Sequence, residues 1–203
     1  MAEDKTEDSQ PNRRRQFLTA LTSAVGMAGA GGMMVPLVAS MTPSARSRAA
    51  GAPVEVDISE LREGRMIVVE WRGKPVWIVR RSEKMLADLT EVRAQLSAPD
   101  STVEQQPAYA ANDHRSIRPE ILVLLGVCTH LGCAPTKKFE RGAASGVSAD
   151  WRGGFFCPCH GSRFDLAGRV FKNVPAPTNL EVPPHSFVTA NRILIGLDSE
   201  ENA

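Results

Sequence analysis

All four cysteines of this 203-residue chain fall in two short segments, CTHLGC at 128–133 and CPCHGS at 157–162. Two of its four histidines lie in the same segments. Six residues that can bind a metal therefore crowd into two loops, although metal and cluster sites commonly take four protein ligands. Two loops that must converge on one site constrain the fold more than any other feature of the chain.

Ordinary uses of cysteine fit these spacings poorly. Structural zinc favours cysteines in CxxC pairs, and a thioredoxin-like redox pair needs the same spacing. The spacings here are C-x-H-x-x-C and C-x-C-H. Two structural disulfides would use every cysteine but leave His130 and His160 without a role. A non-redox structural domain with zinc or disulfides stays open as one alternative.

The pattern C-x-H in one loop and C-x-x-H in the other resembles the Rieske iron–sulfur proteins, whose 2Fe-2S centre has two histidines in place of two cysteines. The resemblance implies one such cluster per chain, with Cys128 and Cys157 on the iron that stays ferric. His130 and His160 would hold the outward-facing iron, which changes between ferric and ferrous. Both histidines would be catalytic, since a ligand histidine, His160 in particular, accepts a hydrogen bond from a quinol and then carries its proton.

The same resemblance assigns roles around the cluster. Cys133 and Cys159 would form a disulfide that clasps the two loops, a pair that Rieske ferredoxins and ring-hydroxylating oxygenases lack. Ser162 and Leu131 are expected to contact the cofactor: the serine hydroxyl would donate to a bridging sulfide, and the leucine would shield the cluster at the docking tip. A turn serine and ordinary packing are the alternatives for these two residues. VPAP at 174–177 matches the proline loop that covers the cluster.

One position departs from the family pattern. High-potential members often carry a tyrosine two residues after the serine, and its hydroxyl bonds the sulfur of a cysteine ligand. Phe164 stands there and offers no donor. We expect a potential below that of tyrosine-bearing relatives, though well above that of plant-type ferredoxins. His114 and His185 lie outside both motifs and are expected to be surface histidines.

The N-terminal part of the chain predicts a membrane anchor. Residues 17–41 carry no charge and follow Arg13, Arg14 and Arg15. As a helix this run would be about 37 Å long, enough to cross a hydrocarbon core of about 30 Å. The arginines favour a cytoplasmic N-terminus, and with QFL they resemble the twin-arginine export motif. An ordinary signal anchor and a cleaved signal peptide are the alternatives.

Composition divides the chain into four parts. Residues 1–12 are polar and predict a cytoplasmic tail, and residues 13–41 hold the signal and transmembrane anchor. Residues 42–53 have the composition of a flexible tether. Residues 54–203 have the size of one domain, with a cluster-binding subdomain expected at about 127–180. The net charge of +1 does not suggest a nucleic-acid partner.

The domain after the tether is expected to be mostly β. Short β-branched runs between turn residues predict strands at Val54–Ile58, Arg65–Trp71, Pro75–Arg81, Ile121–Val127, Ser186–Ala190 and Arg192–Leu197. Ser82–Leu96 has the apolar spacing of a helix, with Ser82 as N-cap, and residues 97–118 predict an irregular surface insertion. With the resemblance, the fold class is one transmembrane helix followed by a Rieske-type antiparallel β-sandwich with a small cluster-binding subdomain and one helix-loop insertion.

Anchor, paired extra cysteines and proline loop together resemble the Rieske subunit of a bacterial ubiquinol–cytochrome c reductase, the cytochrome bc complex. The resemblance implies a quinol–cytochrome c oxidoreductase (translocase) of the respiratory chain in the inner membrane, with this domain in the periplasm. Its partners would be cytochrome b, cytochrome c₁, ubiquinol and membrane lipid, in a dimeric complex. The domain would take one electron from quinol at cytochrome b and move on its tether to reduce cytochrome c₁. The alternative is the Rieske small subunit of a periplasmic molybdenum enzyme such as arsenite oxidase.

Overall fold

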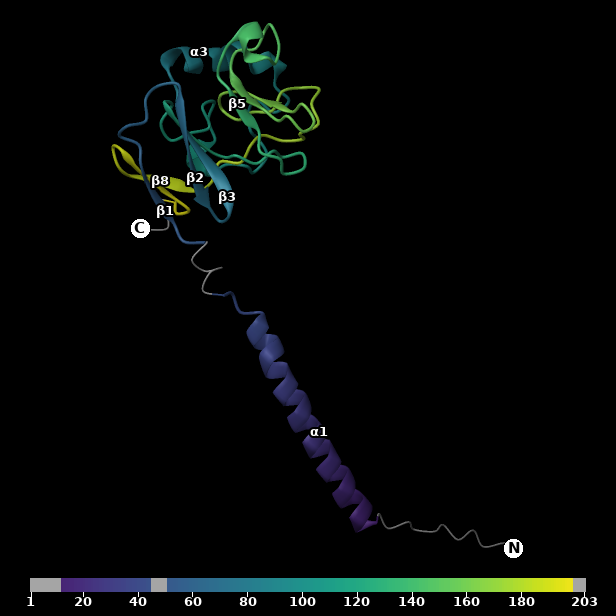
Figure 1. The fold of residues 1–203 in the computed structure, drawn as a ribbon. Coiled ribbons are helices and arrows are strands. Elements are labelled where there is room, and N and C mark those ends of the chain that lie inside the picture. Colours follow the sequence, from purple (N-terminus) through teal and green to yellow (C-terminus); the bar gives the residue numbers. More distant parts are fainter. Residues whose placement is uncertain (1–11, 45–50, 199–203) are drawn as a thin grey trace, which may run out of the picture. The chain divides into compact units, whose positions relative to one another are not determined.

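The computed structural model describes residues 12–44 and 51–198 (Figure 1). The chain forms two compact units. Apart from Asn12, the predicted cytoplasmic tail lies outside the described residues, and so do residues 45–50 of the predicted tether.

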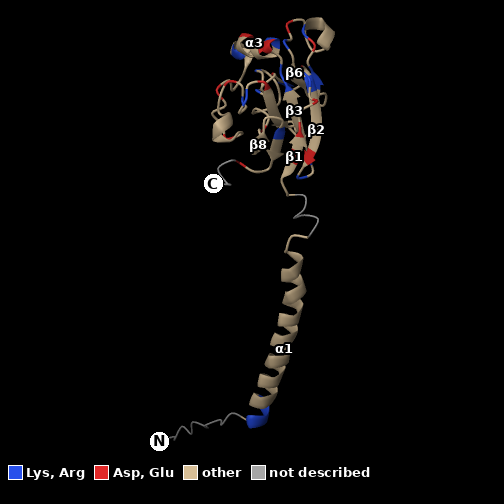
Figure 2. Cartoon of the chain, turned by 90° about the vertical axis from the view of Figure 1, so that its left-hand side faces the viewer, with Lys and Arg blue, Asp and Glu red and all other residues tan. Residues whose placement is uncertain are grey.

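The first unit, Met1–Arg48, contains the helix α1 (Arg13–Ser40). Asn12 begins this helix, because its side-chain oxygen accepts a hydrogen bond of 3.1 Å from the Arg14 N–H. An N-cap of this kind satisfies one of the N–H groups that a helix leaves free at its start. In Figure 2 the positive charge of α1 is confined to its first turn, and the rest of the helix is uncharged.

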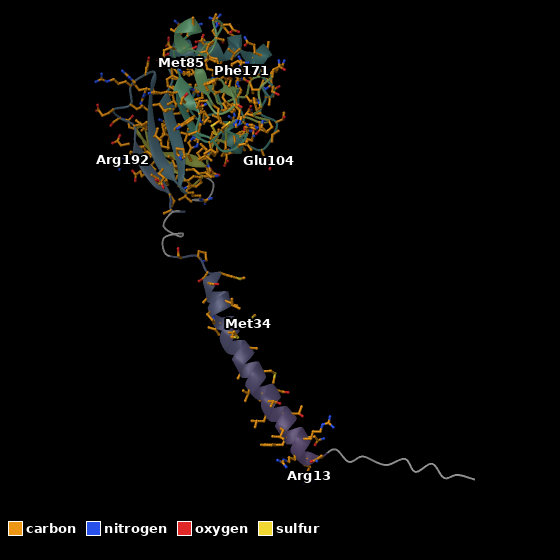
Figure 3. The ribbon with its side chains drawn as sticks, turned by 45° about the vertical axis from the view of Figure 1, so that its right-hand side comes forward. Arg13, Met34, Met85, Glu104, Phe171 and Arg192 are labelled. Carbon is orange, nitrogen blue, oxygen red and sulfur yellow. A yellow bond between two sulfur atoms is a disulfide. The ribbon has the colours of Figure 1, made fainter. Side chains whose placement is uncertain are left out.

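The helix α1 is long and apolar enough to cross a membrane, a criterion of length and composition that a signal sequence also meets. Its side chains, such as Met34 in Figure 3, point outward from the helix and are exposed. The hydroxyl of Thr19 donates to the Arg15 carbonyl at 2.8 Å, so this polar group is satisfied where lipid would offer no partner. Pro36 is accommodated within the helix.

The second unit, Ala49–Ala203, is mostly β, and its described residues form three antiparallel sheets of three strands each. The first sheet has the order β1 (Val54–Asp57), β9 (Arg192–Ile195), β8 (His185–Thr189). The second has the order β2 (Arg65–Trp71), β3 (Lys74–Arg80), β4 (Ile121–Leu125). The third has the order β5 (Thr136–Lys138), β6 (Gly154–Phe156), β7 (Arg163–Phe164). In Figure 1 the blue β1 accordingly lies beside the yellow C-terminal strands.

The strand β4 shows how the sheets share their cores. All five of its residues are buried. Alternate side chains point to opposite faces of the sheet, and each face is covered by a hydrophobic core. Val123 packs with Val76 and Ile195 in the core between the first two sheets. Leu122 and Leu124 pack in a second core that extends to the third sheet. This two-sided burial explains why the strand reads as an uninterrupted apolar run in the sequence.

The second core fixes the third sheet against the second. The rings of Trp77 on β3 and Phe155 on β6 stack with centroids 4.8 Å apart, and Phe164 on β7 is fully buried in the same core. Gly126, just after β4, passes under the Trp77 ring, where an added Cβ would lie 2.3 Å from ring atoms. A glycine is therefore required at the point where the chain enters the first cysteine segment.

Within residues 51–198 the α-helix is α3 (Glu83–Glu91), which begins at the predicted cap, since the Ser82 hydroxyl accepts from the Met85 N–H. It ends five residues before the predicted boundary at Leu96, and the chain continues as the 3₁₀ helix η1 (Arg93–Gln95). Two further 3₁₀ turns are η2 (Ala108–Ala110) and η3 (Gly142–Ser145). The predicted strand Arg65–Trp71 has the observed bounds, and the other predicted strands differ at their ends by one to two residues.

The prediction that residues 97–118 form a surface insertion was wrong for part of this segment. Arg115 is fully buried and donates to the carbonyls of Ala167 (3.0 Å) and Leu180 (2.7 Å). Ser101 and Ser116 are buried as well. The segment looks polar because its buried polar groups bond to chain segments about 50 to 80 residues away.

Buried arginines fasten this segment to the chain that follows the second motif. Arg81 donates to the carbonyls of His114 (2.9 Å) and Leu166 (3.0 Å), so it bridges the two segments. Burial lowers the pKa of Arg81 to about 9 and that of Arg115 to about 10. Both guanidinium groups thus stay charged at neutral pH, and their hydrogen bonds to carbonyls compensate for the lost water.

Candidate metal centre

The first cysteine segment is a closed loop that follows β4. The Cys128 N–H donates to the Cys133 carbonyl at 2.7 Å, and the Gly132 N–H donates back to the Cys128 carbonyl at 3.0 Å. Gly132 has a φ of +80°, in the left-handed region that favours glycine. These two bonds turn the backbone of CTHLGC around its first residue.

The second segment repeats this arrangement between β6 and β7. The Cys157 N–H donates to the Ser162 carbonyl at 2.8 Å, and the Gly161 N–H donates to the Cys157 carbonyl at 2.9 Å. Gly161 has a φ of +76°. The two six-residue segments therefore share one backbone frame, with a cysteine at the first position and a left-handed glycine at the fifth. We call them the first and second cluster loops.

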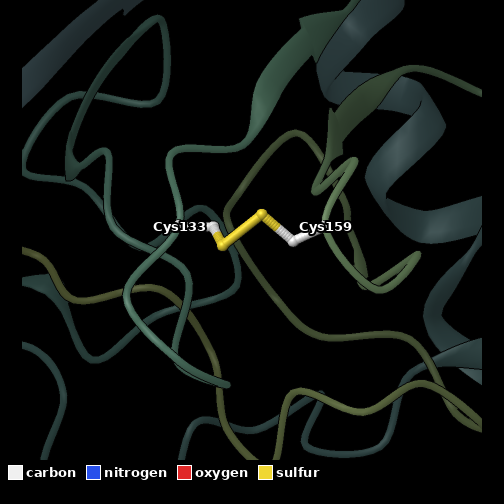
Figure 4. The surroundings of a disulfide bond; sticks show 2 residues. All are labelled: Cys133 and Cys159. Carbon is white, nitrogen blue, oxygen red and sulfur yellow. A yellow bond between two sulfur atoms is a disulfide. The ribbon is translucent and has the colours of Figure 1, made fainter.

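A disulfide between Cys133 and Cys159 joins the two loops (Figure 4). This is the pair that the family resemblance implied. The sulfur atoms of Cys133, Cys157 and Cys159 lie within 4.8 Å of one another. Because two of these sulfurs are bonded to each other, Cys157 is the member of this group that offers a free thiol.

The remaining donors are two thiols and two imidazoles. Cys128 and Cys157 are free, and each is 2% exposed. The rings of His130 and His160 lie edge to face with centroids 4.8 Å apart, the first half-buried and the second exposed. The structure thus brings the two histidines together and places both thiols in the same buried core, with the thiols inward and the imidazoles outward.

This donor set fits a Rieske cluster. Burial, followed by the proximity of the Cys157 thiol, raises the pKa of the Cys128 thiol. Two buried thiolates side by side would be unfavourable without a positive charge to neutralise them, and bound iron supplies that charge. Imidazoles on the solvent side match the mixed ligation that distinguishes this centre from four-cysteine clusters.

Ser162 is fully buried and contacts the proline loop. Its hydroxyl oxygen accepts a hydrogen bond of 3.0 Å from the Ala176 N–H. Burial is the main cause of the raised pKa of the Cys128 thiol, and the Ser162 hydroxyl acts in the opposite direction by lowering it. The proline segment 174–177 therefore contacts the second cluster loop through Ala176.

Two residues of the site were missed in the sequence. Thr129, inside the first motif, donates through its hydroxyl to the Thr178 carbonyl at 2.7 Å. Ala176, inside the proline segment, is the donor to Ser162. A threonine at the second motif position was the available signal for the first, whereas a backbone N–H leaves no signal in the sequence.

Leu131 and Phe164 occupy opposite environments. Leu131, inside the first cluster loop, is 71% exposed. Phe164 lies in the second core and pairs with Phe155 across β6 and β7. No hydroxyl is present at this position to donate to a sulfur.

The expectation of two surface histidines was wrong for His185. This residue is 1% exposed, and its Nδ1 lies 2.8 Å from the Pro183 carbonyl. Its ring packs edge to face against Tyr109, whose hydroxyl accepts from the His185 N–H. His114 is half-buried. Burial lowers the pKa of both histidines.

Comparison with known proteins agrees with this geometry. The family model described as "Rieske [2Fe-2S] domain" matches residues 53–184. The model described as "Ubiquitinol-cytochrome C reductase Fe-S subunit TAT signal" matches residues 4–44. The chain is 60% identical to the ubiquinol-cytochrome c reductase iron-sulfur subunit of Allochromatium vinosum, over 91% of this chain and 89% of the relative.

The chain belongs to the Rieske iron–sulfur subunits of ubiquinol–cytochrome c reductase. It is 42% identical to the subunit of the same name from Blastochloris viridis, over 94% of this chain and 97% of that one. A solved structure titled "Hyperthermophilic respiratory Complex III" is 26% identical, with a TM-score of 0.46 over 86% of this chain and 98% of that chain.

Membership confirms several predictions from the sequence. The chain has the mostly β Rieske fold, its cofactor is a 2Fe-2S cluster, and it is a component of the quinol–cytochrome c oxidoreductase. The twin-arginine signal is confirmed, and with α1 it fits a membrane-anchored subunit. The alternatives of an arsenite oxidase subunit and of a non-redox zinc or disulfide domain are not supported.

Proposed function

We propose that this subunit takes one electron from ubiquinol at a quinol-oxidation site on cytochrome b and passes it to cytochrome c₁. The observation that carries the proposal is the pair of cluster loops, which hold two buried thiols and two adjacent outward imidazoles. Cys128, Cys157, His130 and His160 would hold the cluster. When bound, the cluster supplies a reversible one-electron carrier with a raised potential.

His160 is proposed to meet the quinol. It is the more exposed of the two histidines, and an imidazole that binds a metal through one ring nitrogen keeps the other available. That second nitrogen would accept the hydrogen bond from the quinol hydroxyl and then hold its proton. His130, whose ring packs against that of His160, would occupy the neighbouring position and fix its orientation.

Leu131 is proposed to exclude water at the docking surface. Its side chain is exposed next to His130 in the first cluster loop. An apolar contact with cytochrome b would remove water from around the histidines and strengthen the hydrogen bond to the quinol.

The anchor and tether would set the working geometry of the subunit. Arginines confined to the first turn of α1 favour a cytoplasmic N-terminus in a bacterial inner membrane. The domain at residues 54–203, called the head below, would then lie in the periplasm. The tether predicted at residues 42–53 would let the head travel between cytochrome b and cytochrome c₁. The complex is expected to be a dimer.

The experiment is an EPR spectrum of reduced membranes, recorded with and without an inhibitor of the quinol-oxidation site. We expect the signal of a Rieske 2Fe-2S centre, with line positions that shift when the inhibitor displaces quinone. A Rieske signal that the inhibitor leaves unchanged would contradict contact with quinone at this site.

A further inference from the structure

The hydroxyl oxygen of Ser162 receives a hydrogen bond from one direction. This oxygen is buried and accepts from the Ala176 N–H at 3.0 Å. A hydroxyl has one proton and two lone pairs, and it rotates to suit its partners. When the oxygen receives a bond from one side, its own proton is directed away from that side. The sulfur atoms of the cluster site are nearby acceptors, since the Cys157 N–H donates to the Ser162 carbonyl at 2.8 Å and the free thiols of Cys128 and Cys157 lie in one buried core.

The proline segment is built to present this one N–H. Pro175 and Pro177 flank Ala176 and have no N–H of their own. Each proline also fixes its own φ near −65°, which limits the backbone on both sides of Ala176. Ala176 is 4% exposed, so water does not compete for its N–H.

Bonds to both neighbouring segments hold the loop in place. Thr129 of the first cluster loop donates to the Thr178 carbonyl at 2.7 Å. Asn179 is fully buried, accepts from the Val170 N–H at 2.8 Å and donates to the Ser101 hydroxyl at 2.9 Å. The position of Ala176 is therefore set by contacts on its C-terminal side that do not involve Ser162.

We propose that Ala176 is a positioning residue whose N–H turns the Ser162 hydroxyl toward the sulfur atoms of the cluster site. Hydrogen bonds to these sulfurs stabilise the reduced, more negative state and raise the potential. Without the Ala176 N–H, the hydroxyl divides its proton among several directions and donates to sulfur for less of the time. The inference rests on the proposed role of Cys128 as a ligand.

Redox titration of the full chain in membranes tests the inference with four variants. Ala176→Pro removes the N–H, whereas Ala176→Gly keeps it and serves as the matched control. We expect Ala176→Pro to lower the midpoint potential, by less than Ser162→Ala does, and Ala176→Gly to stay near the unsubstituted protein. The double variant Ser162→Ala/Ala176→Pro should have the potential of Ser162→Ala alone, because the N–H acts through the hydroxyl. Equal potentials in Ala176→Pro and Ala176→Gly, or fully additive decreases, would overturn the inference.

Hydrogen exchange keeps the test decisive if Ala176→Pro does not fold. Between Val174 and Thr178 the prolines leave Ala176 as the one intervening amide, so a peptide covering this segment reports on it directly. We expect the Ala176 amide to exchange several-fold faster in Ser162→Ala, while the Val170 amide, bonded to Asn179, keeps its rate. An unchanged rate at Ala176 would show that the hydrogen bond to Ser162 is not formed. This measurement is independent of the proposed function, which fails instead if the unsubstituted protein lacks a Rieske signal.

Discussion

The two cluster loops have the same backbone frame but different side chains at corresponding positions. Both begin with a free, buried cysteine and turn at a left-handed glycine in the fifth position. The fourth position is Leu131 in the first loop and His160 in the second, and the sixth is Cys133 in the first and Ser162 in the second. One frame thus carries a free cysteine twice. Each loop adds one histidine and one cysteine of the disulfide, and an exposed Leu131 in the first loop contrasts with a buried Ser162 in the second.

The largest effect is expected from the position that the loops share. Cys128→Ser and Cys157→Ser should each abolish the cluster, because a serine hydroxyl is not ionised at neutral pH and binds iron poorly. Iron content per chain and the EPR signal of reduced membranes measure this. Thr136→Ser, a similarly small change on the neighbouring strand β5, is the control and should keep both. If one of the two cysteine variants retained a normal cluster, the shared ligand role would be wrong for that loop.

The disulfide between the two cluster loops is expected to stabilise the folded protein. Replacing both Cys133 and Cys159 with serine should lower the free energy of unfolding by about 3–4 kcal/mol, since the bond closes a loop over a sequence separation of 26 residues. Thermal unfolding of the oxidised protein, compared with the double variant, measures the loss. A melting temperature unchanged by the double substitution would mean that the loops are held together without the disulfide.

The shared glycine predicts matching effects in the two loops. Gly132→Ala and Gly161→Ala should each cost about 1–2 kcal/mol, because alanine is strained at positive φ. Apart from the adjacent residues, no heavy atom of the described part of the chain lies within 4 Å of an added Cβ at either position, so the two variants should differ little. Denaturant unfolding of both variants measures the cost. A large difference between them would show that the backbone frame is less similar than the hydrogen bonds indicate.

A smaller effect is expected where the second loop enters β7. Phe164→Tyr should raise the midpoint potential, because the added hydroxyl would donate to a cysteine sulfur and stabilise the reduced state. Redox titration measures the shift, and the EPR line shape should stay that of a Rieske centre. Phe156→Tyr, on the same small sheet, is the matched control and should leave the potential unchanged. If Phe164→Tyr has no higher potential than the control, the missing hydroxyl does not tune this centre.

The smallest effect is expected from His185 on β8, outside the two cluster loops. Burial lowers the pKa of His185 in the folded protein below its ordinary value of 6.5. The unfolded chain therefore binds a proton more readily, and stability should fall as pH drops below about 6.5. Unfolding free energies measured between pH 8 and pH 5 should decrease less steeply for His185→Gln than for the unsubstituted protein. Equal slopes would mean that His185 does not contribute to this loss.

Short-range patterns in the sequence predicted much of the fold and of the site. The strand Arg65–Trp71 and the cap at Ser82 follow from local alternation and capping chemistry. The loop contents follow from two motifs that carry their donors within six residues each. Such features depend on neighbours in the chain, so they can be read without knowing the fold.

What could not be predicted depends on contacts between distant segments. Arg115 and His185 look like surface residues because their partners, such as Leu180 and Tyr109, lie 65 and 76 residues away. The bond from Ala176 to Ser162 uses a backbone N–H, which every residue except proline has. A sequence therefore shows which residues can bind a cluster but not which groups hold those residues in position.

The central claim is that the two loops together give one centre two thiolates and two imidazoles. Pulsed EPR on the reduced protein, with histidine labelled with ¹⁵N, counts the nitrogen ligands directly. We predict two coupled histidine nitrogens, one contributed by each loop, in the unsubstituted protein and in a control with His114 and His185 replaced by glutamine. Two nitrogens that persist after His130 or His160 is replaced, or a single nitrogen in the unsubstituted protein, would contradict the account.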